Sequence, residues 1–290
     1  MTNRVWFLSR PRVCETTMIS SDGISPTSLH ATKTFRYLTY HEISNTEPEY
    51  RYSVSLAKFA EHARCLRRLA DVRHSESGSC PITFDDGHIS QFDLALPVLK
   101  EFSIKAIFFV TAGWVGRREG YMSWKHVDEI ARAGYEVQSH GWSHACLSRC
   151  SNRELDVELR RSKSELESHL GIRVSAISAP GGRWNQRVLL ACHDAGYERL
   201  FISEPWATTK KQDGIEVLGR WMVTRTTDEN EISAWLKGRG APVALARMRN
   251  LATSAVKRAI GDRSYERVWR ALARKNRSIE SQYSGKETKT

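Results

Sequence analysis

Short apolar runs alternate with stretches of helical periodicity along the central part of the chain. The runs typical of strands are 35–43, 80–84, 105–111, 135–140, 174–180, 197–203 and 215–224. Between them, apolar residues recur at helical spacing in 54–73, 89–102, 123–134, 151–171, 185–196 and 228–238. Because alternating strands and helices form right-handed units around a parallel sheet, this order predicts an α/β fold. Six or seven such units in about 200 residues favour a closed barrel over an open sheet.

The N-terminal end of the chain lacks this alternation. Residues 1–34 are rich in Ser and Thr without periodicity, and we interpret them as a poorly ordered leader. The apolar run at residues 5–8 is shorter than the core of a secretory signal. No stretch approaches the roughly 20 apolar residues of a membrane span. These features lead us to expect a cytoplasmic protein.

The net charge of +11 is concentrated at the C-terminal end, where residues 239–290 carry +9. Residues 242–277 are predicted to form two helices. In the second, the apolar Tyr265, Trp269 and Leu272 share one face, with arginines mostly outside it. This pattern suits a helix that lies on an anionic membrane surface, and it suits a helix docked on the barrel with a solvated basic face equally well. Charge alone is compatible with nucleic-acid binding, but no recognition motif supports it, so no nucleic-acid partner is expected.

Three predicted strands end in ionisable residues. Asp85 and Asp86 follow the apolar run 80–84, His140 ends the run 135–140 with His144 four residues later, and His41 follows "YLTY" in the first strand. In a parallel barrel the carboxyl ends of the strands share one rim, where active sites are built. These side chains are therefore predicted to converge. A surface turn is the alternative for Asp85 and Asp86, because Asp-Asp-Gly is a common turn composition.

The predicted convergence suits a metal site. Two imidazoles and one carboxylate give a divalent ion three protein ligands and leave a fourth position open for water. The second carboxylate is then free to act as a general base. For each histidine taken alone, a structural role is the alternative.

The combination of "TFDDG" at 83–87 with H-x-x-x-H at 140–144 resembles the polysaccharide deacetylases, the NodB-homology group also called carbohydrate esterase family 4. The resemblance covers about residues 36–224 and implies a distorted (β/α)7 barrel. It also implies that Asp85 is the catalytic base and that Asp86, His140 and His144 bind the metal. Zinc is the expected ion, with Co²⁺, Ni²⁺ and Fe²⁺ as alternatives.

A later motif of that family departs from its usual form. The family has an Arg-x-Pro-aromatic stretch that positions the base and supplies a backbone N–H to the oxyanion. Here the chain reads "SAPGGRW" at 178–184, so Pro180 aligns, the preceding Arg is absent and Gly181 replaces the aromatic residue. A backbone N–H needs no particular side chain, so Gly181 is retained as the oxyanion donor. Arg183 is the candidate replacement for the missing Arg.

A histidine near the end of the domain, which protonates the leaving amine in many members, is also missing. The chain has no histidine between Phe201 and Thr290. "LTYHEI" at 38–43 resembles the Tyr-His motif on the first strand of exported poly-N-acetylglucosamine deacetylases, whose His takes that role. His41 is therefore the candidate acid, with a buried structural histidine as the alternative.

Taken together, the sequence predicts a deacetylase domain at 35–240 followed by a basic helical extension at 241–290. The expected activity is metal-dependent removal of an N-acetyl group from an amino sugar in a poly-, oligo- or lipid-linked saccharide. The expected location is the cytoplasm or the inner face of the membrane, with residues 242–277 contacting the lipid. The alternatives are an amidase acting on a non-sugar substrate and a catalytically impaired saccharide-binding relic.

Overall fold

The computed structural model describes residues 37–73, 82–205 and 210–248. The predicted leader 1–34 lies outside these residues, as do residues 249–290 of the basic extension. Residues 241–248 are helical, and the predicted apolar face with Tyr265, Trp269 and Leu272 lies outside the described residues. Within the described ranges, no helix has both the length and the apolar character that crossing a bilayer requires. The domain boundaries and the membrane contact therefore stay predictions.

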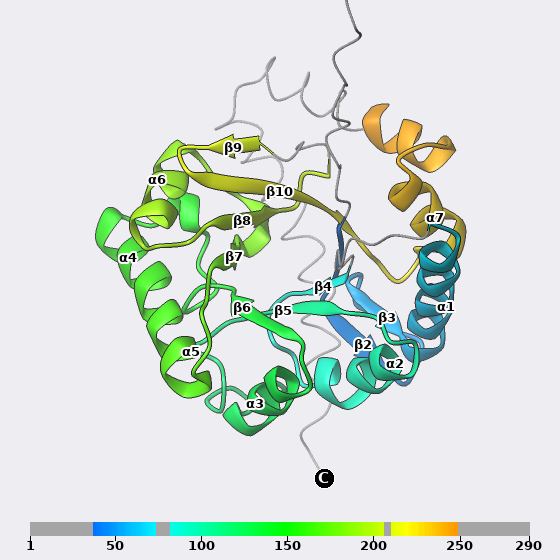
Figure 1. The fold of residues 1–290 in the computed structure, drawn as a ribbon, viewed down its shortest axis with the longest axis horizontal. Helices are drawn as coiled ribbons and strands as arrows, with labels where there is room; N and C mark the ends of the chain where they lie inside the picture. The colour runs from blue at the N-terminus through cyan, green and yellow to red at the C-terminus, as the bar shows by residue number, and fades with distance from the viewer. Residues whose placement is uncertain (1–36, 74–81, 206–209, 249–290) are drawn as a thin grey trace, which may run out of the picture. The chain divides into compact units, whose positions relative to one another are not determined.

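Seven parallel strands close into a barrel (Figure 1). In spatial order they are β1 (Tyr37–Tyr40), β4 (Ile82–Phe84), β5 (Ala106–Val110), β6 (Glu136–Ser139), β7 (Ala176–Ser178), β8 (Arg199–Ile202) and β10 (Ile215–Met222). The barrel closes where β1 pairs in parallel with β10, with Leu38 opposite Trp221. This architecture confirms the predicted (β/α)7 barrel. The sequence did not predict the antiparallel β9 (Lys210–Gln212) beside β10, or the separate parallel pair β2 (Glu42–Ser44) and β3 (Ser53–Ser55).

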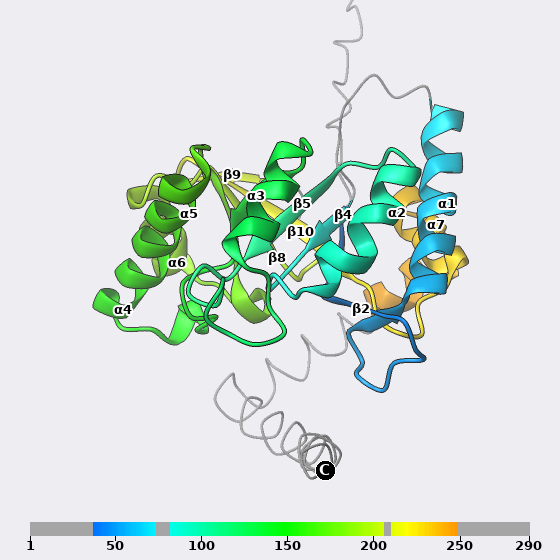
Figure 2. The same ribbon diagram turned by 90° about the horizontal axis from the view of Figure 1, so that it is seen from below.

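Helices surround the strands (Figures 1 and 2). They are α1 (Leu56–Arg73), α2 (Leu96–Glu101), α3 (Trp124–Arg132), α4 (Asn152–Asp156), α5 (Ser162–Leu170), α6 (Gln186–Asp194) and α7 (Glu229–Lys237). Two predicted helices, 89–102 and 151–171, are interrupted by the π turns η1 (Gln91–Ala95) and η3 (Val157–Arg161). The short 3₁₀ segments are η2 (Leu147–Arg149) and η4 (Pro180–Gly182). Side-chain caps at Ser123 and Asp228 begin α3 and α7, as the sequence pattern of a helix start predicts.

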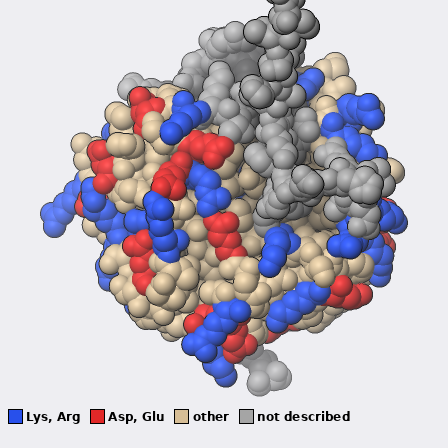
Figure 3. Space-filling view, in the orientation of Figure 1, with Lys and Arg blue, Asp and Glu red and all other residues tan. Residues whose placement is uncertain are grey.

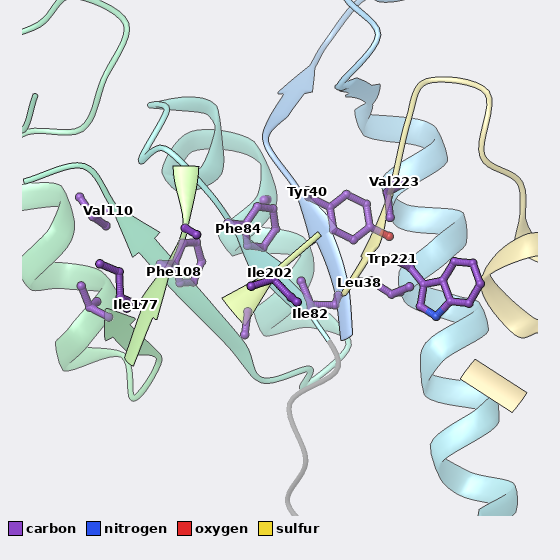
Figure 4. Packing of buried hydrophobic residues seen from close by; sticks show 14 of the residues in the cluster. Leu38, Tyr40, Ile82, Phe84, Phe108, Val110, Ile177, Ile202, Trp221 and Val223 are labelled. Atoms are coloured by element: carbon purple, nitrogen blue, oxygen red, sulfur yellow. The ribbon is translucent and has the colours of Figure 1, made fainter. Parts of the chain in front are cut away.

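Alternate residues of each strand face the helices or the barrel interior. Leu38, Phe84, Phe108 and Ile202 belong to the larger buried cluster, which includes residues of the surrounding helices (Figure 4). The intervening positions form a second buried cluster made of Tyr37, Ile107, Phe109, Ala176, Phe201 and Leu218. Because residues two apart in a strand share a face, this second cluster fills the interior of the barrel.

The interior becomes polar toward the carboxyl ends of the strands. Asp85 continues the inward positions of β4, Ser178 lies two residues after Ala176 on β7, and Arg220 lies two residues after Leu218 on β10. All three are buried. The alternation that builds the core therefore also directs these three side chains to one place.

Charged residues of both signs are interspersed on the described part of the face in Figure 3. This mixture agrees with the sequence, in which residues 239–290 carry +9 of the net charge of +11. The barrel itself is therefore nearly neutral overall.

A buried histidine links the first strand to the surrounding helices. His62 Nε2 lies 3.1 Å from the carbonyl oxygen of Thr227, and its Nδ1 lies 3.1 Å from the hydroxyl of Tyr40. A carbonyl can only accept, so Nε2 carries the proton and Nδ1 accepts from Tyr40. Burial, which outweighs the nearby backbone acceptor, lowers the pKa of His62 to about 4.

We expect His62 to make the fold sensitive to acid. Its pKa in the unfolded chain is about 6.5, so the unfolded state binds the proton first as the pH falls. The stabilisation is complete above that value and is lost between about pH 6.5 and 4, by up to about 3 kcal/mol. Urea unfolding across this range should show a shallower decline for His62→Gln than for the wild type. Parallel curves for the two proteins would contradict the assignment.

Candidate active site

The two motif histidines and one motif carboxylate meet at a single point. Ligand atoms of Asp86, His140 and His144 all lie within 4.8 Å of one another. The Nε2 atoms of both histidines are 3.2 Å from Oδ1 of Asp86. This arrangement contradicts the surface-turn alternative for Asp86, because the side chain faces two histidines instead of solvent.

The backbone after β4 separates the two adjacent acids. Asp86 and Gly87 both adopt the left-handed conformation, with φ of 77° and 85°. Residues other than Gly, Asn and Asp are unfavourable in this conformation. Asp at position 86 therefore suits the backbone and also supplies a carboxylate. The turn leaves Asp85 inside the barrel and aims Asp86 at His140 and His144. Two adjacent carboxylates can therefore have different roles.

The three side chains fit a divalent cation. His140 Nδ1 donates to the carbonyl oxygen of Ser178 at 2.9 Å, which leaves Nε2, 3.2 Å from Asp86 Oδ1, as the ring nitrogen that a metal ion could use. Asp86 Oδ1 is buried without a hydrogen-bond partner among the described residues, although two imidazoles approach it. Burial alone would raise the pKa of Asp86, but these imidazoles hold it well below its usual value. The carboxylate is thus ionised, and two nitrogens and one oxygen are the donors that zinc accepts.

Asp85 is held by a buried arginine from the last strand of the barrel. Arg220 Nη1 donates to Oδ1 at 2.7 Å and Nη2 donates to Oδ2 at 2.8 Å. Ser178 accepts from Arg220 Nη2 at 2.7 Å and donates to Asp85 Oδ2 at 3.0 Å. The guanidinium lies over the neighbouring rings of Phe109 and Phe201, 5.4 and 5.7 Å from their centres. Burial would raise the pKa of Asp85, but the charge of Arg220 outweighs it and keeps this pKa below its usual value.

Arg220 corrects the expectation for Arg183. The position beside Asp85 expected for Arg183 is filled by Arg220, and the Arg183 side chain is exposed. Ser178 occupies the sequence position where the family motif has its Arg, so a small hydroxyl there makes room for a guanidinium from β10. Sequence reasoning missed Arg220. The available signal was an arginine at an inward position of an otherwise apolar strand, "IEVLGRWM".

His41 lies at the end of β1, next to the end of β4. The two ends are linked because Asp85 N donates to the carbonyl oxygen of Tyr40 at 3.0 Å, and Gln91 Nε2 donates to the carbonyl oxygen of His41 at 2.7 Å. The Nδ1 atom of His41 is buried without a hydrogen-bond partner within the described part of the chain. Burial lowers the pKa of His41, and the charges of Asp86 and Asp85 oppose that shift.

The loop after β7 contains the other predicted residues. Pro180 is buried, Gly181 is exposed with φ of 65°, and Gly182 N donates to the carbonyl oxygen of Ala179 at 2.8 Å to close the turn. The N–H of Gly181 is not the one used in this closing bond. A Cβ on Gly181 would meet nothing within 4 Å, whereas one on Gly182 would lie 2.4 Å from Ser203. Steric crowding therefore requires glycine at 182, and the space above 181 is open.

An aromatic residue that sequence reasoning missed lies against the cluster of Asp86, His140 and His144. Trp114 stacks on His144 with 5.2 Å between ring centres and 29° between planes. The guanidinium of Arg118 covers Trp114 at 4.0 Å from its ring centre. Trp114 thus packs on one side of His144 and restricts the orientation of its imidazole.

The comparison with protein families decides the identity of the central segment. Residues 73–200 match the family model described as polysaccharide deacetylase. This segment is similar to the polysaccharide deacetylase family. The match includes the two motifs, at 83–87 and 140–144, on which the resemblance was inferred. The resemblance is therefore confirmed, and the seven-stranded barrel agrees with the (β/α)7 fold of the NodB type.

Known deacetylases support this placement. A chitooligosaccharide deacetylase of Sinorhizobium fredii is 30% identical over 141 residues, which cover 45% of this chain and 60% of that protein. A poly-beta-1,6-N-acetyl-D-glucosamine N-deacetylase of Staphylococcus epidermidis is 25% identical over 215 residues, 67% of this chain and 74% of that protein. The matches to three other curated relatives cover 55%, 28% and 25% of their lengths.

The fold has counterparts among solved structures. The Streptococcus pyogenes deacetylase PplD in complex with acetate is similar with a TM-score of 0.61 at 20% identity, covering 70% of this chain and 98% of that chain. At this identity the likeness concerns the fold.

Proposed function

We propose that the protein is a metal-dependent hydrolase that removes N-acetyl groups from amino sugars in a poly-, oligo- or lipid-linked saccharide. The observation that carries the proposal is the convergence of Asp86, His140 and His144 beside an Asp85 that is fixed by Arg220. The relative in Staphylococcus epidermidis, a poly-beta-1,6-N-acetyl-D-glucosamine N-deacetylase, supports an N-acetylated glucosamine polymer as the substrate class.

Asp86, His140 and His144 would hold the metal. Zn²⁺ suits two imidazoles and a carboxylate, and Co²⁺, Ni²⁺ and Fe²⁺ accept the same donors. When bound, a divalent ion lowers the pKa of water and polarises a carbonyl group. His140 is fixed for this task by its bond to Ser178, and His144 by its stacking on Trp114.

Asp85 is the proposed general base. It takes a proton from the attacking water, whose oxygen forms a bond to the acetyl carbon. Arg220 and Ser178 orient both carboxylate oxygens and keep Asp85 ionised, which a base requires. The N–H of Gly181 is the proposed donor to the oxyanion, held in place by the turn at Pro180.

His41 is the proposed general acid. It donates a proton to the departing nitrogen as the C–N bond breaks, so that acetate and a free amino sugar are released. Because burial lowers the pKa of His41, the neutral ring is favoured before reaction. The proton it donates therefore comes from the reaction itself, by way of the base.

Acetate release from N-acetylglucosamine oligomers tests the proposal. Zn²⁺-loaded protein should release acetate, and chelator-treated protein should not until the metal is restored. N-acetylated amino acids and peptides serve as non-sugar amides. Turnover of these amides with none of the oligomers would replace the deacetylase by an amidase. Binding of oligomers without any turnover would indicate a relic.

His41→Ala is expected to lower kcat for acetate release by about 10²-fold, the low end of the usual contribution of general acid–base catalysis. The Kd for Zn²⁺ should not change, because His41 is not among the three converging ligands. Added imidazole should restore part of the rate. An unchanged kcat would assign His41 a structural role and the acid to another group.

A further inference from the structure

A buried carboxylate supports the loop between the two metal-binding histidines. Glu158 lies in the π turn η3 and is 5% exposed. Its Oε2 accepts from Trp142 N at 2.8 Å and from Ser143 N at 3.0 Å, and its Oε1 accepts from the Ser143 hydroxyl. Three donors from one loop therefore converge on a single side chain more than a dozen residues away. Nothing in the chemistry proposed above uses Glu158.

The N–H groups of the loop depend on side-chain acceptors, whereas the carbonyl oxygens of Gly141 and Trp142 accept from Ala112 N and Gly113 N. Gly141 N donates to Ser139 Oγ at 3.1 Å, and Trp142 N and Ser143 N both donate to Glu158. These three N–H groups are successive, and each binds a side chain. The loop then reaches His144, which has φ of 63°. Without Glu158, the loop would lose the acceptor of the two N–H groups that directly precede His144, whose conformation is unfavourable for a side chain.

Gly141 and Glu158 are sterically matched. A Cβ on Gly141 would lie 3.0 Å from Glu158 Oε2, and Gly141 has φ of 79°. The glycine directly after the first metal-binding histidine thus makes room for the carboxylate. The contact with Glu158 therefore accounts for glycine at position 141, which binding of a metal by His140 and His144 does not require.

We infer that Glu158 is a positioning residue of the metal site, which sets the distance and orientation of His144 relative to His140. It acts through the backbone of the loop at 141–143. The inference rests on the metal site of the proposed function. Removing groups that orient metal ligands typically weakens metal affinity by about 10–100-fold.

Zn²⁺ affinity of the purified full chain, measured by competition with a chromophoric chelator, tests the inference. Glu158→Gln keeps the shape but removes the charge and one of the two acceptor oxygens, so either the N–H groups or the Ser143 hydroxyl must face an NH₂. We expect its Kd for Zn²⁺ to rise about 10–100-fold. Glu154→Gln is the matched control, because Glu154 lies on the preceding helix α4, is exposed and accepts from Ser151 N at 2.7 Å. Its Kd should equal that of the wild type.

The outcomes separate this inference from the proposed function. If the wild type binds no Zn²⁺, both fail. If Glu158→Gln binds Zn²⁺ with the Kd of the wild type while its thermal midpoint falls, Glu158 is only structural and the inference alone fails. Should Glu158→Gln not fold, Ser143→Ala decides, because it removes one donor from an exposed residue. An unchanged Kd in Ser143→Ala would then overturn the inference, and a rise of about threefold would support it.

Discussion

An Asp85→Asn variant is expected to release acetate about 10²–10⁴-fold more slowly than the wild type, which is the usual contribution of a positioned general base. Asn has nearly the shape of Asp but cannot accept the proton of the attacking water. The measurement is kcat with N-acetylglucosamine oligomers at saturating Zn²⁺. The Kd for Zn²⁺ should change little, because Asp86, His140 and His144 remain.

Asp86→Asn provides the contrast. It removes the charged ligand, so both the Zn²⁺ affinity and the rate should fall. A full rate in Asp85→Asn would show that another group is the base and would remove the proposed role of the Arg220–Asp85 pair in catalysis.

Arg220→Met is expected to lower the free energy of unfolding by about 3–5 kcal/mol, because it leaves Asp85 buried without its partner. Met has a similar volume to the arginine stem, so the loss reflects the charge and its hydrogen bonds. Urea unfolding measures the effect. The double variant Asp85→Asn with Arg220→Met should recover part of the loss, since it leaves no unpaired buried charge. Equal stability of the single and double variants would contradict this account of the pair.

The same variant has a predicted signature in its dependence on pH. Arg220 keeps the pKa of Asp85 below its usual value, so in the wild type the base stays ionised into the acidic range. The pair stabilises the fold above the pKa of an ordinary Asp, about 4, and this stabilisation is lost as the pH falls through the lowered value. In Arg220→Met the pKa of Asp85 rises, so the acidic limb of kcat/KM should move to higher pH. Arg220→Lys keeps the charge but not both parallel bonds and should shift less.

The motifs that follow strands could be predicted from the sequence because their chemistry is local. Asp85 and Asp86 directly follow an apolar strand, and His140 and His144 lie within one loop, so strand ends and spacing placed them on one rim. The barrel itself followed from the alternation of strands and helices. The sequence did not predict the interruption of helix 151–171 by η3, because the apolar residues of 151–171 keep the spacing of a regular helix.

The partners of those motifs could not be predicted, because they lie far away in the sequence. Arg220 and Asp85 are 135 residues apart, and only the closure of the barrel brings them together. Arg183 was the nearer candidate, but the turn at Pro180 leaves it exposed. Glu158 is one of several charged residues in the predicted helix 151–171, and its burial depends on how that helix meets the loop at 141–143.

The position of Arg220 on the closing strand has a consequence for the synthesis of the protein. Translation produces Asp85 and both histidines long before β10 (Ile215–Met222), so a nascent chain holds the base without its guanidinium until the final strand has left the ribosome. That strand must then insert between β1 and β8, a long-range pairing of the kind that slows folding. The Asp85–Arg220 pair and the closed sheet therefore form in the same late step of folding. Chains that end before β10 should release no acetate.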